Sequence, residues 1–155
     1  MLIREFLPQD ARTCCEVINA CVPSIQGLNA AARFHIIAKN VPDDLYQDLQ
    51  QWYTLVVELH GQIVAVGALD HKEIRRLYVS PDVQGYGIGS ALMNALETEA
   101  RSRNYEQVSL EASPNSERFY LQLGYQSVGQ DRREVGAAVF EYVKMTKILS
   151  QGASV

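Results

Sequence analysis

Gln84-Gly85-Tyr86-Gly87-Ile88-Gly89-Ser90 is the stretch of this sequence that decides the fold and points most directly to a ligand. Its alternating glycines let the backbone pass close to a ligand, because glycine has no Cβ. A strand is predicted before the stretch, and apolar residues recur at helical spacing after it. A helix N-terminus offers unpaired N–H groups and the positive end of the helix dipole. The stretch therefore predicts a site for a phosphate or pyrophosphate.

Working outward from this loop, alternating apolar residues, turn residues and helix caps predict a mixed α/β domain. We expect Ser113 to cap a helix that begins at Pro114 and ends before Gly124. Glu97 and Arg101 are expected to pair on the solvent side of the helix that follows the loop. The predicted strands cover 2–6, 52–59, 62–69, 73–79, 107–112, 125–128 and 138–146, and the predicted helices cover 8–22, 25–51 with a break at 40–42, 88–100 and 114–123.

Length and charge narrow the classes of partner. The chain has 155 residues, a length that predicts a single domain spanning residues 1–150 and a flexible tail spanning 151–155. Its formal net charge of −4 argues against a nucleic-acid partner. No apolar run is long enough to span a membrane, and the N-terminus does not resemble a signal peptide. Six arginines could still surround an anionic ligand: Arg75, Arg76, Arg101, Arg103, Arg132 and Arg133.

The three cysteines, Cys14, Cys15 and Cys21, lie within one predicted helix. An odd number of cysteines in one short segment is typical of reduced thiols in a cytoplasmic protein. Because no histidine or carboxylate completes a recognisable ligand set, we expect buried small apolar side chains and no metal.

Two well-known phosphate loops do not fit the glycine stretch. A P-loop requires a lysine and then a hydroxyl residue after its glycines, and here Ser90 follows Gly89 directly. A dinucleotide-binding loop requires a third glycine at the position that Ser90 occupies, within a βαβ unit. The β-hairpin predicted before the loop does not suit that unit.

The loop instead resembles the Arg/Gln-x-x-Gly-x-Gly/Ala motif of the GNAT superfamily of acyl-CoA-dependent N-acyltransferases. Residues 77–81, Leu-Tyr-Val-Ser-Pro, look like the strand that leads into this loop in the family. Residues 119–125, Phe-Tyr-Leu-Gln-Leu-Gly-Tyr, resemble its Phe-Tyr-x-x-x-Gly-Phe/Tyr segment. The resemblance covers 52–147 well and 2–22 loosely. It implies a mixed, mostly antiparallel sheet of about six or seven strands, about four helices and a splayed central strand pair.

The resemblance also implies acetyl-CoA as co-substrate, with the loop amides on its pyrophosphate and a strand backbone along its pantetheine arm. The family's coenzyme-contacting asparagine would correspond to Ser113, with Asn115 two residues later, and the sequence leaves open which of them serves. The implied coenzyme-binding residues are Leu77, Tyr78, Val79, Gln84, Gly85, Tyr86, Gly87, Ile88, Gly89, Ser90, and Ser113 or Asn115.

For chemistry, the resemblance implies direct transfer of acetyl to a primary amine of a small molecule or peptide. Tyr120 matches the family's general acid, because a phenol stays protonated at neutral pH. Glu73 falls where the family commonly has a carboxylate that takes the amine's proton through water, and a solvated turn residue is the alternative for Glu73. A non-catalytic acyl-CoA sensor or partner-binding module with the same fold is the alternative function, and a homodimer is a family-level expectation.

Overall fold

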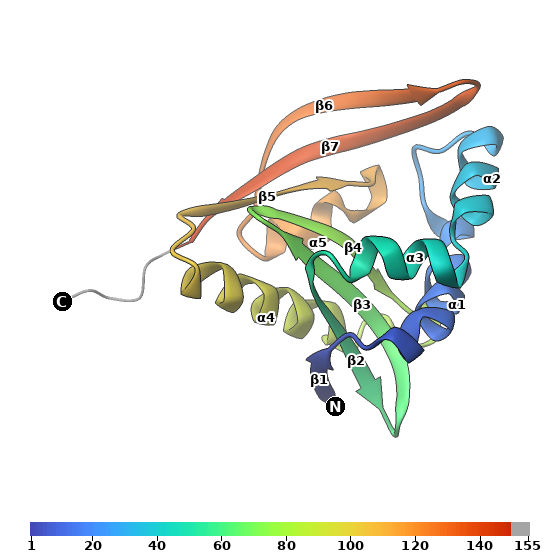
Figure 1. Cartoon of the computed structure of the whole chain (residues 1–155). Helices are drawn as coiled ribbons and strands as arrows, with labels where there is room; N and C mark the ends of the chain where they lie inside the picture. The colour runs from blue at the N-terminus through green and yellow to red at the C-terminus, as the bar shows by residue number, and fades with distance from the viewer. Residues whose placement is uncertain (150–155) are drawn as a thin grey trace.

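The computed structural model describes residues 1–149, in which helices cover both faces of one sheet (Figure 1). The predicted tail at 151–155 lies outside the described residues. The strands are β1 (Leu2–Glu5), β2 (Tyr53–Leu59), β3 (Gln62–Asp70), β4 (Glu73–Val79), β5 (Gln107–Ala112), β6 (Gln126–Val135) and β7 (Ala138–Ile148). The helices are α1 (Ala11–Cys21), α2 (Ala30–Lys39), α3 (Pro42–Leu49), α4 (Ile88–Ser102) and α5 (Glu117–Gln122).

The seven strands are ordered β1-β2-β3-β4-β5-β7-β6, and every neighbouring pair is antiparallel except the parallel β4 and β5. This arrangement confirms the predicted mixed, mostly antiparallel sheet. The helical region predicted at 25–51 forms two helices, because the chain leaves α2 at Asn40 and Pro42 begins α3. The predicted break at 40–42 is thus present, and the described chain has five α-helices where the family resemblance implied about four.

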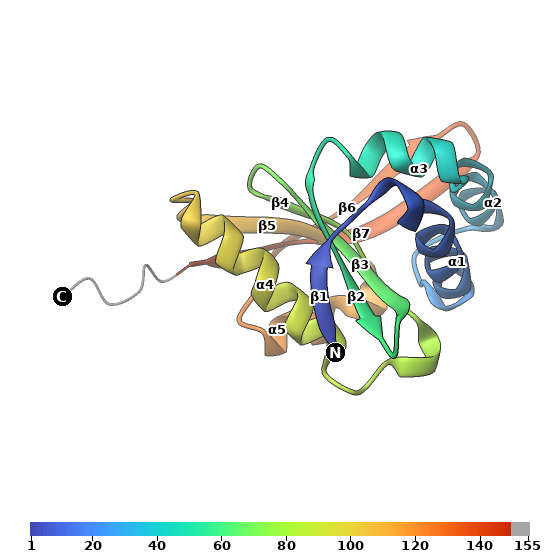
Figure 2. The same ribbon diagram turned by 60° about the horizontal axis from the view of Figure 1, so that its bottom comes forward.

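Alternation along the central strands sends side chains to two separate cores. Leu55 and Val57 of β2 pack in the core formed with α4, whereas Val56 between them packs with α1 and α3. Figure 2 shows α4 on one side of the central strands and α1 with α3 on the other. Cys14, Cys15 and Cys21 are buried and free, as predicted. None of the helices within residues 1–149 is both long and apolar enough to cross a bilayer.

Three local predictions were wrong, the first of them in part. Ser113 stands at the N-cap position of a 3-10 turn that begins at Pro114, but its side chain makes no capping bond: its hydroxyl meets that of Ser116 at 2.8 Å, and α5 begins only at Glu117. Glu97 is buried, with 3% of its surface exposed, instead of facing solvent. Strand β6 runs on to Val135, beyond its predicted end at Val128. All ten β6 residues are exposed, so the strand lacks the apolar alternation by which a sequence pattern finds strands.

Candidate active site

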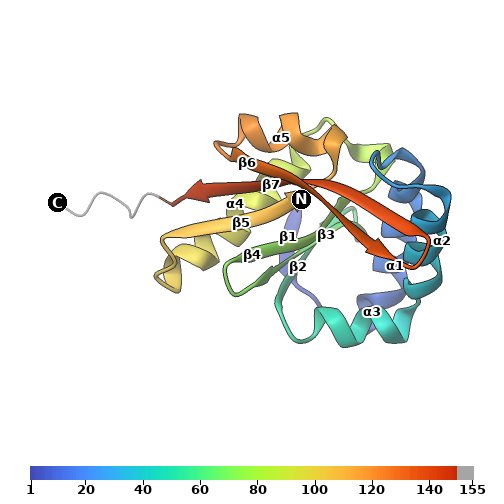
Figure 3. The same ribbon diagram turned by 90° about the horizontal axis from the view of Figure 1, so that it is seen from above.

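The central feature of the site is the gap that opens between β4 and β5. In the described chain these strands share one residue pair, Glu73 with Ser109, and a Ser109 N–H bond to the Lys72 carbonyl at 2.9 Å. Beyond this point the two strands diverge, as seen from above in Figure 3. A cleft of about 1280 Å³ occupies the region, and all predicted site residues except Tyr86 line it. The splayed pair predicted from the family resemblance is therefore present.

A bulge in β4 accompanies this splay. Val66 pairs with Tyr78 and Ala68 with Arg75, so Gly67 alone faces two residues, Arg76 and Leu77. Arg76 has φ 57, which is uncommon for a residue other than glycine. A Cβ on Gly67 would lie 2.8 Å from Leu77 Cδ1, so glycine is needed for Leu77 to pack there.

The end of β4 presents main-chain groups to the gap. The Ser80 N–H donates to the Val64 carbonyl on β3 at 2.8 Å, so by alternation the polar groups of Val79 point away from β3. The Val79 carbonyl accepts a bond from Gln84 Nε2 at 2.9 Å and another from Cys21 Sγ at 3.1 Å. Both donors are contributed by elements that line the cleft.

The glycines of the loop serve different purposes. Gly85 and Gly87 have φ 88 and 81, and a Cβ on either would have no heavy atom within 4 Å. Both are exposed beside the first turn of α4, which leaves open space at the helix N-terminus for an anion. Gly89 instead makes room for Phe119, whose Cζ would lie 3.1 Å from its Cβ. The Tyr86 side chain is 81% exposed and does not line the cleft.

Tyr120 lies in the wall of the cleft on α5, and 8% of its surface is exposed. Burial, together with the nearby phenol of Tyr78, raises the pKa of Tyr120 well above its usual range. The phenol is therefore protonated at every pH at which the protein would work. This protonation state is the one that a general acid requires.

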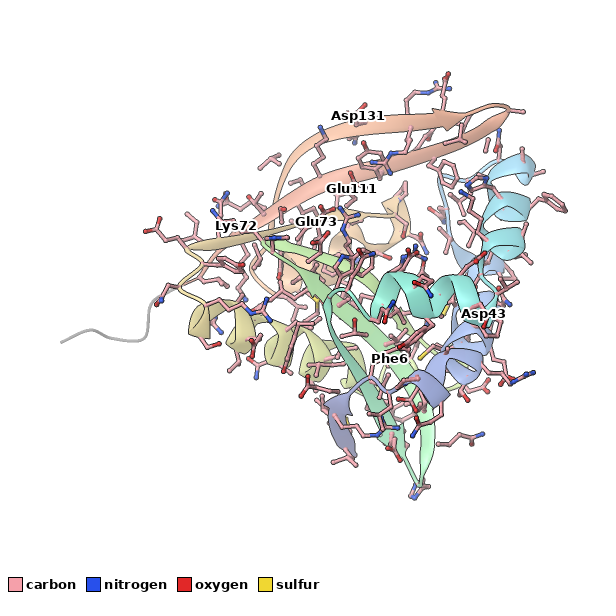
Figure 4. All side chains as sticks on the ribbon, viewed as in Figure 1. Phe6, Asp43, Lys72, Glu73, Glu111 and Asp131 are labelled. Atoms are coloured by element: carbon pink, nitrogen blue, oxygen red, sulfur yellow. The ribbon has the colours of Figure 1, made fainter. Side chains whose placement is uncertain are left out.

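Glu73 lies at the start of β4, where the gap opens, with Glu111 of β5 nearby (Figure 4). Its carboxylate accepts a bond from Arg75 Nη2 at 2.9 Å. Burial is the main cause that raises the pKa of Glu73, and Glu111 and Asp70 add to it. A carboxylate with a raised pKa is a stronger base, which suits the predicted role.

The two candidates for the coenzyme-contacting position differ in their bonding. Asn115 Oδ1 accepts from the Gln26 N–H at 3.1 Å, and its Nδ2 donates to the Ser24 carbonyl at 3.0 Å. The Asn115 side chain thus connects the 3-10 turn at Pro114–Ser116, just before α5, to the segment that follows α1. The Ser113 side chain bonds only to the Ser116 hydroxyl within the described chain, so it is the freer of the two side chains.

Charged residues missed by sequence analysis also line the cleft, among them Asp48 and Glu111. Arg76 pairs with Asp48 at 2.8 Å and Arg133 with Glu111 at 3.1 Å. The six arginines that could surround an anionic ligand each pair with a carboxylate of this chain, and Arg75, Arg76 and Arg133 line the cleft. No local pattern shows the Arg76–Asp48 and Arg133–Glu111 pairs, because each joins segments that are distant in the sequence. Within residues 1–149 no group of three or more His, Cys, Asp or Glu is placed to hold a metal ion.

Comparison with known proteins agrees with this geometry. The profile of the family described as "Acetyltransferase (GNAT) domain" matches residues 21–149. A solved GCN5-related N-acetyltransferase from Rhodopseudomonas palustris superposes with a TM-score of 0.89 at 25% identity, covering 96% of this chain and 95% of that one. The PaiA N-acetyltransferase from Thermoplasma acidophilum, solved with coenzyme A, has a TM-score of 0.78 at 17% identity, covering 96% and 98%.

Curated sequences give shorter matches. An amino-acid acetyltransferase from Mycobacterium tuberculosis is 32% identical over 93 residues, which cover 56% of this chain and 53% of that protein. An uncharacterized acetyltransferase from Streptococcus pyogenes serotype M1 is 32% identical over 76 residues, covering 49% and 53%. The chain thus spans about half the length of these curated relatives.

Proposed function

The chain belongs to the GNAT acetyltransferase family, and on this basis we propose that it transfers an acetyl group from acetyl-CoA to a primary amine. The observation that carries the proposal is the gap between β4 and β5, with Glu73 where it opens and both Tyr120 and the glycine loop in its lining. A cleft with a base candidate, an acid candidate and an anion-binding helix N-terminus suits acyl transfer from a phosphate-bearing thioester.

The residues of the cleft fit acetyl-CoA. The open space beside Gly85 and Gly87 would take the pyrophosphate, held by N–H groups at the start of α4. The edge of β4 from Leu77 to Val79, which makes no ladder with β5, would bind the pantetheine arm as an added strand. The coenzyme would supply the activated acetyl group as a thioester.

In the proposed reaction an acceptor ammonium first loses a proton to Glu73 through water. The neutral amine then attacks the thioester carbonyl, a C–N bond forms, the nitrogen loses its second proton to water, and the C–S bond breaks. Tyr120 gives its proton to the leaving thiolate and is reprotonated from solvent. The products are the acetylated amine and free coenzyme A. The buried cysteines take no part: burial raises the pKa of Cys14 to about 12, and burial also raises that of Cys21, so neither is a ready thiolate.

The test is release of free coenzyme A from acetyl-CoA in the presence of a panel of amines: polyamines, amino acids, aminoglycosides and peptide N-termini. We expect release that depends on one class of amine and saturates with its concentration. Tight acetyl-CoA binding without amine-dependent release would instead indicate a sensor that keeps the fold.

A further inference from the structure

Glu97 of α4 is a buried carboxylate that the proposed reaction does not use. Its Oε2 accepts a bond of 2.7 Å from the Tyr125 hydroxyl, and its Oε1 accepts one of 2.8 Å from Lys147 Nζ. Arg101 is more distant, at 3.8 Å. Burying a carboxylate is costly unless it is paired and hydrogen-bonded, so the burial of Glu97 depends on its bonds to Tyr125 and Lys147.

Tyr125 is held on three sides. Its hydroxyl bonds to Glu97, and Lys147 Nζ lies over its ring, 5.6 Å from the ring centroid. Its N–H donates to the Tyr120 carbonyl at 3.1 Å, and its ring meets the Tyr120 ring edge to face, with centroids 5.8 Å apart. Tyr125 therefore links Glu97 to Tyr120.

Tyr120 itself has no hydrogen-bond partner for its hydroxyl among residues 1–149. Two neighbouring aromatic rings, those of Phe119 and Tyr125, pack edge to face against its ring. A general acid must point at the atom it protonates, so the orientation of this ring matters for rate.

We propose that Glu97, acting through Tyr125, is a positioning residue for Tyr120 in the acetyl transfer. The inference rests on the proposed function. Neither Glu97 nor Tyr125 lines the cleft, so neither would touch a substrate. Their effect should therefore fall on turnover and leave substrate binding alone.

The experiment measures kcat and the KM for acetyl-CoA with the best amine of the panel. Tyr125→Phe removes only the hydroxyl and should lower kcat about three- to tenfold, with the KM for acetyl-CoA unchanged. Glu97→Leu should do the same. Glu97→Gln keeps an oxygen that accepts the Tyr125 bond, so it should restore most of kcat.

Two comparisons separate positioning from simple loss of stability. Val56→Ala, in the core on the opposite face of the sheet, should lower the melting temperature without changing kcat. In a Tyr120→Phe background, Tyr125→Phe should cause no further loss of kcat, because its effect passes through the Tyr120 hydroxyl. A full additional loss in that background, or wild-type kcat in Tyr125→Phe alone, would overturn the inference. Absence of amine-dependent release by the wild-type protein would overturn the proposed function and this inference with it.

Discussion

Glu73 lies opposite Ser109 in the one residue pair that joins β4 to β5 within the described chain. Its carboxylate therefore stands where the cleft begins, with burial raising its pKa. As the pH falls through this raised pKa, the carboxylate gains a proton and can no longer act as base. We predict that kcat/KM falls on the acid side, and that Glu73→Gln lowers it at neutral pH by about 10²-fold, within the usual range for general bases.

A pH profile of kcat/KM checks this prediction. The acid limb should vanish in Glu73→Gln, because the group that titrates has been removed. An acid limb that persists unchanged in this variant would assign the base to another residue.

Tyr120→Phe removes the proposed proton donor while keeping the ring. Turnover should drop by more than about tenfold, with acetyl-CoA affinity nearly unchanged. Steady-state kinetics together with calorimetric titration separates the two effects. Tyr105→Phe, a tyrosine outside the cleft, is the matched control and should behave like wild type. Unaltered turnover in Tyr120→Phe would remove the tyrosine from the mechanism.

Gly87→Val should abolish acetyl-CoA binding, because it strains a residue at φ 81 and fills the open space at the start of α4. Gly61→Val is the control: Gly61 has φ 78 and similarly open space, but it lies in the turn between β2 and β3. Both variants should lose similar stability in thermal melts. Only Gly87→Val should lose affinity in calorimetry, and retained affinity there would refute the pyrophosphate assignment.

Gly67→Ala tests the bulge in β4. The new Cβ would meet Leu77, Leu92 and Leu96, at 2.8 to 3.3 Å, so Leu77 should be pushed toward the gap. We expect a loss of roughly 1–2 kcal/mol in the free energy of unfolding, typical of overpacking, and weaker acetyl-CoA binding. Gly129→Ala, with nothing within 4 Å, should change neither quantity in denaturant melts or titrations. Identical results for the two variants would mean that the bulge tolerates the methyl group.

The sequence predicted the parts of the fold whose cause is local. The glycine loop, the apolar face of α4 and the break before Pro42 each reflect residues next to one another. The placement of Glu97 could not be predicted this way, since its spacing to Arg101 suggested a surface pair while its partner Lys147 is 50 residues away. The positive φ of Arg76 also has no local signal, because arginine does not favour that conformation.

The candidate site likewise has features with a local sequence signal and features without one. All the residues predicted from the two motifs except Tyr86 line the cleft, but most of the other lining residues belong to no motif, and the ion pairs of Asp48 and Glu111 depend on how distant segments meet. Strand β6 is an intermediate case. Its charged residues do not alternate with apolar ones, yet it pairs along its length with β7. Charged residues on an exposed edge strand protect it against pairing with another strand. Because these residues replace the apolar alternation, the sequence pattern does not reveal the full length of β6.

The divergence of β4 from β5 also has a mechanical meaning. Within the described chain, one residue pair joins the half of the sheet formed by β1 to β4 to the half formed by β5 to β7. A substrate arm lying between the two halves would take the place of the ladder that β4 and β5 do not form beyond Glu73 and Ser109. The coenzyme would then serve as a temporary strand of the fold, present only while the substrate is bound.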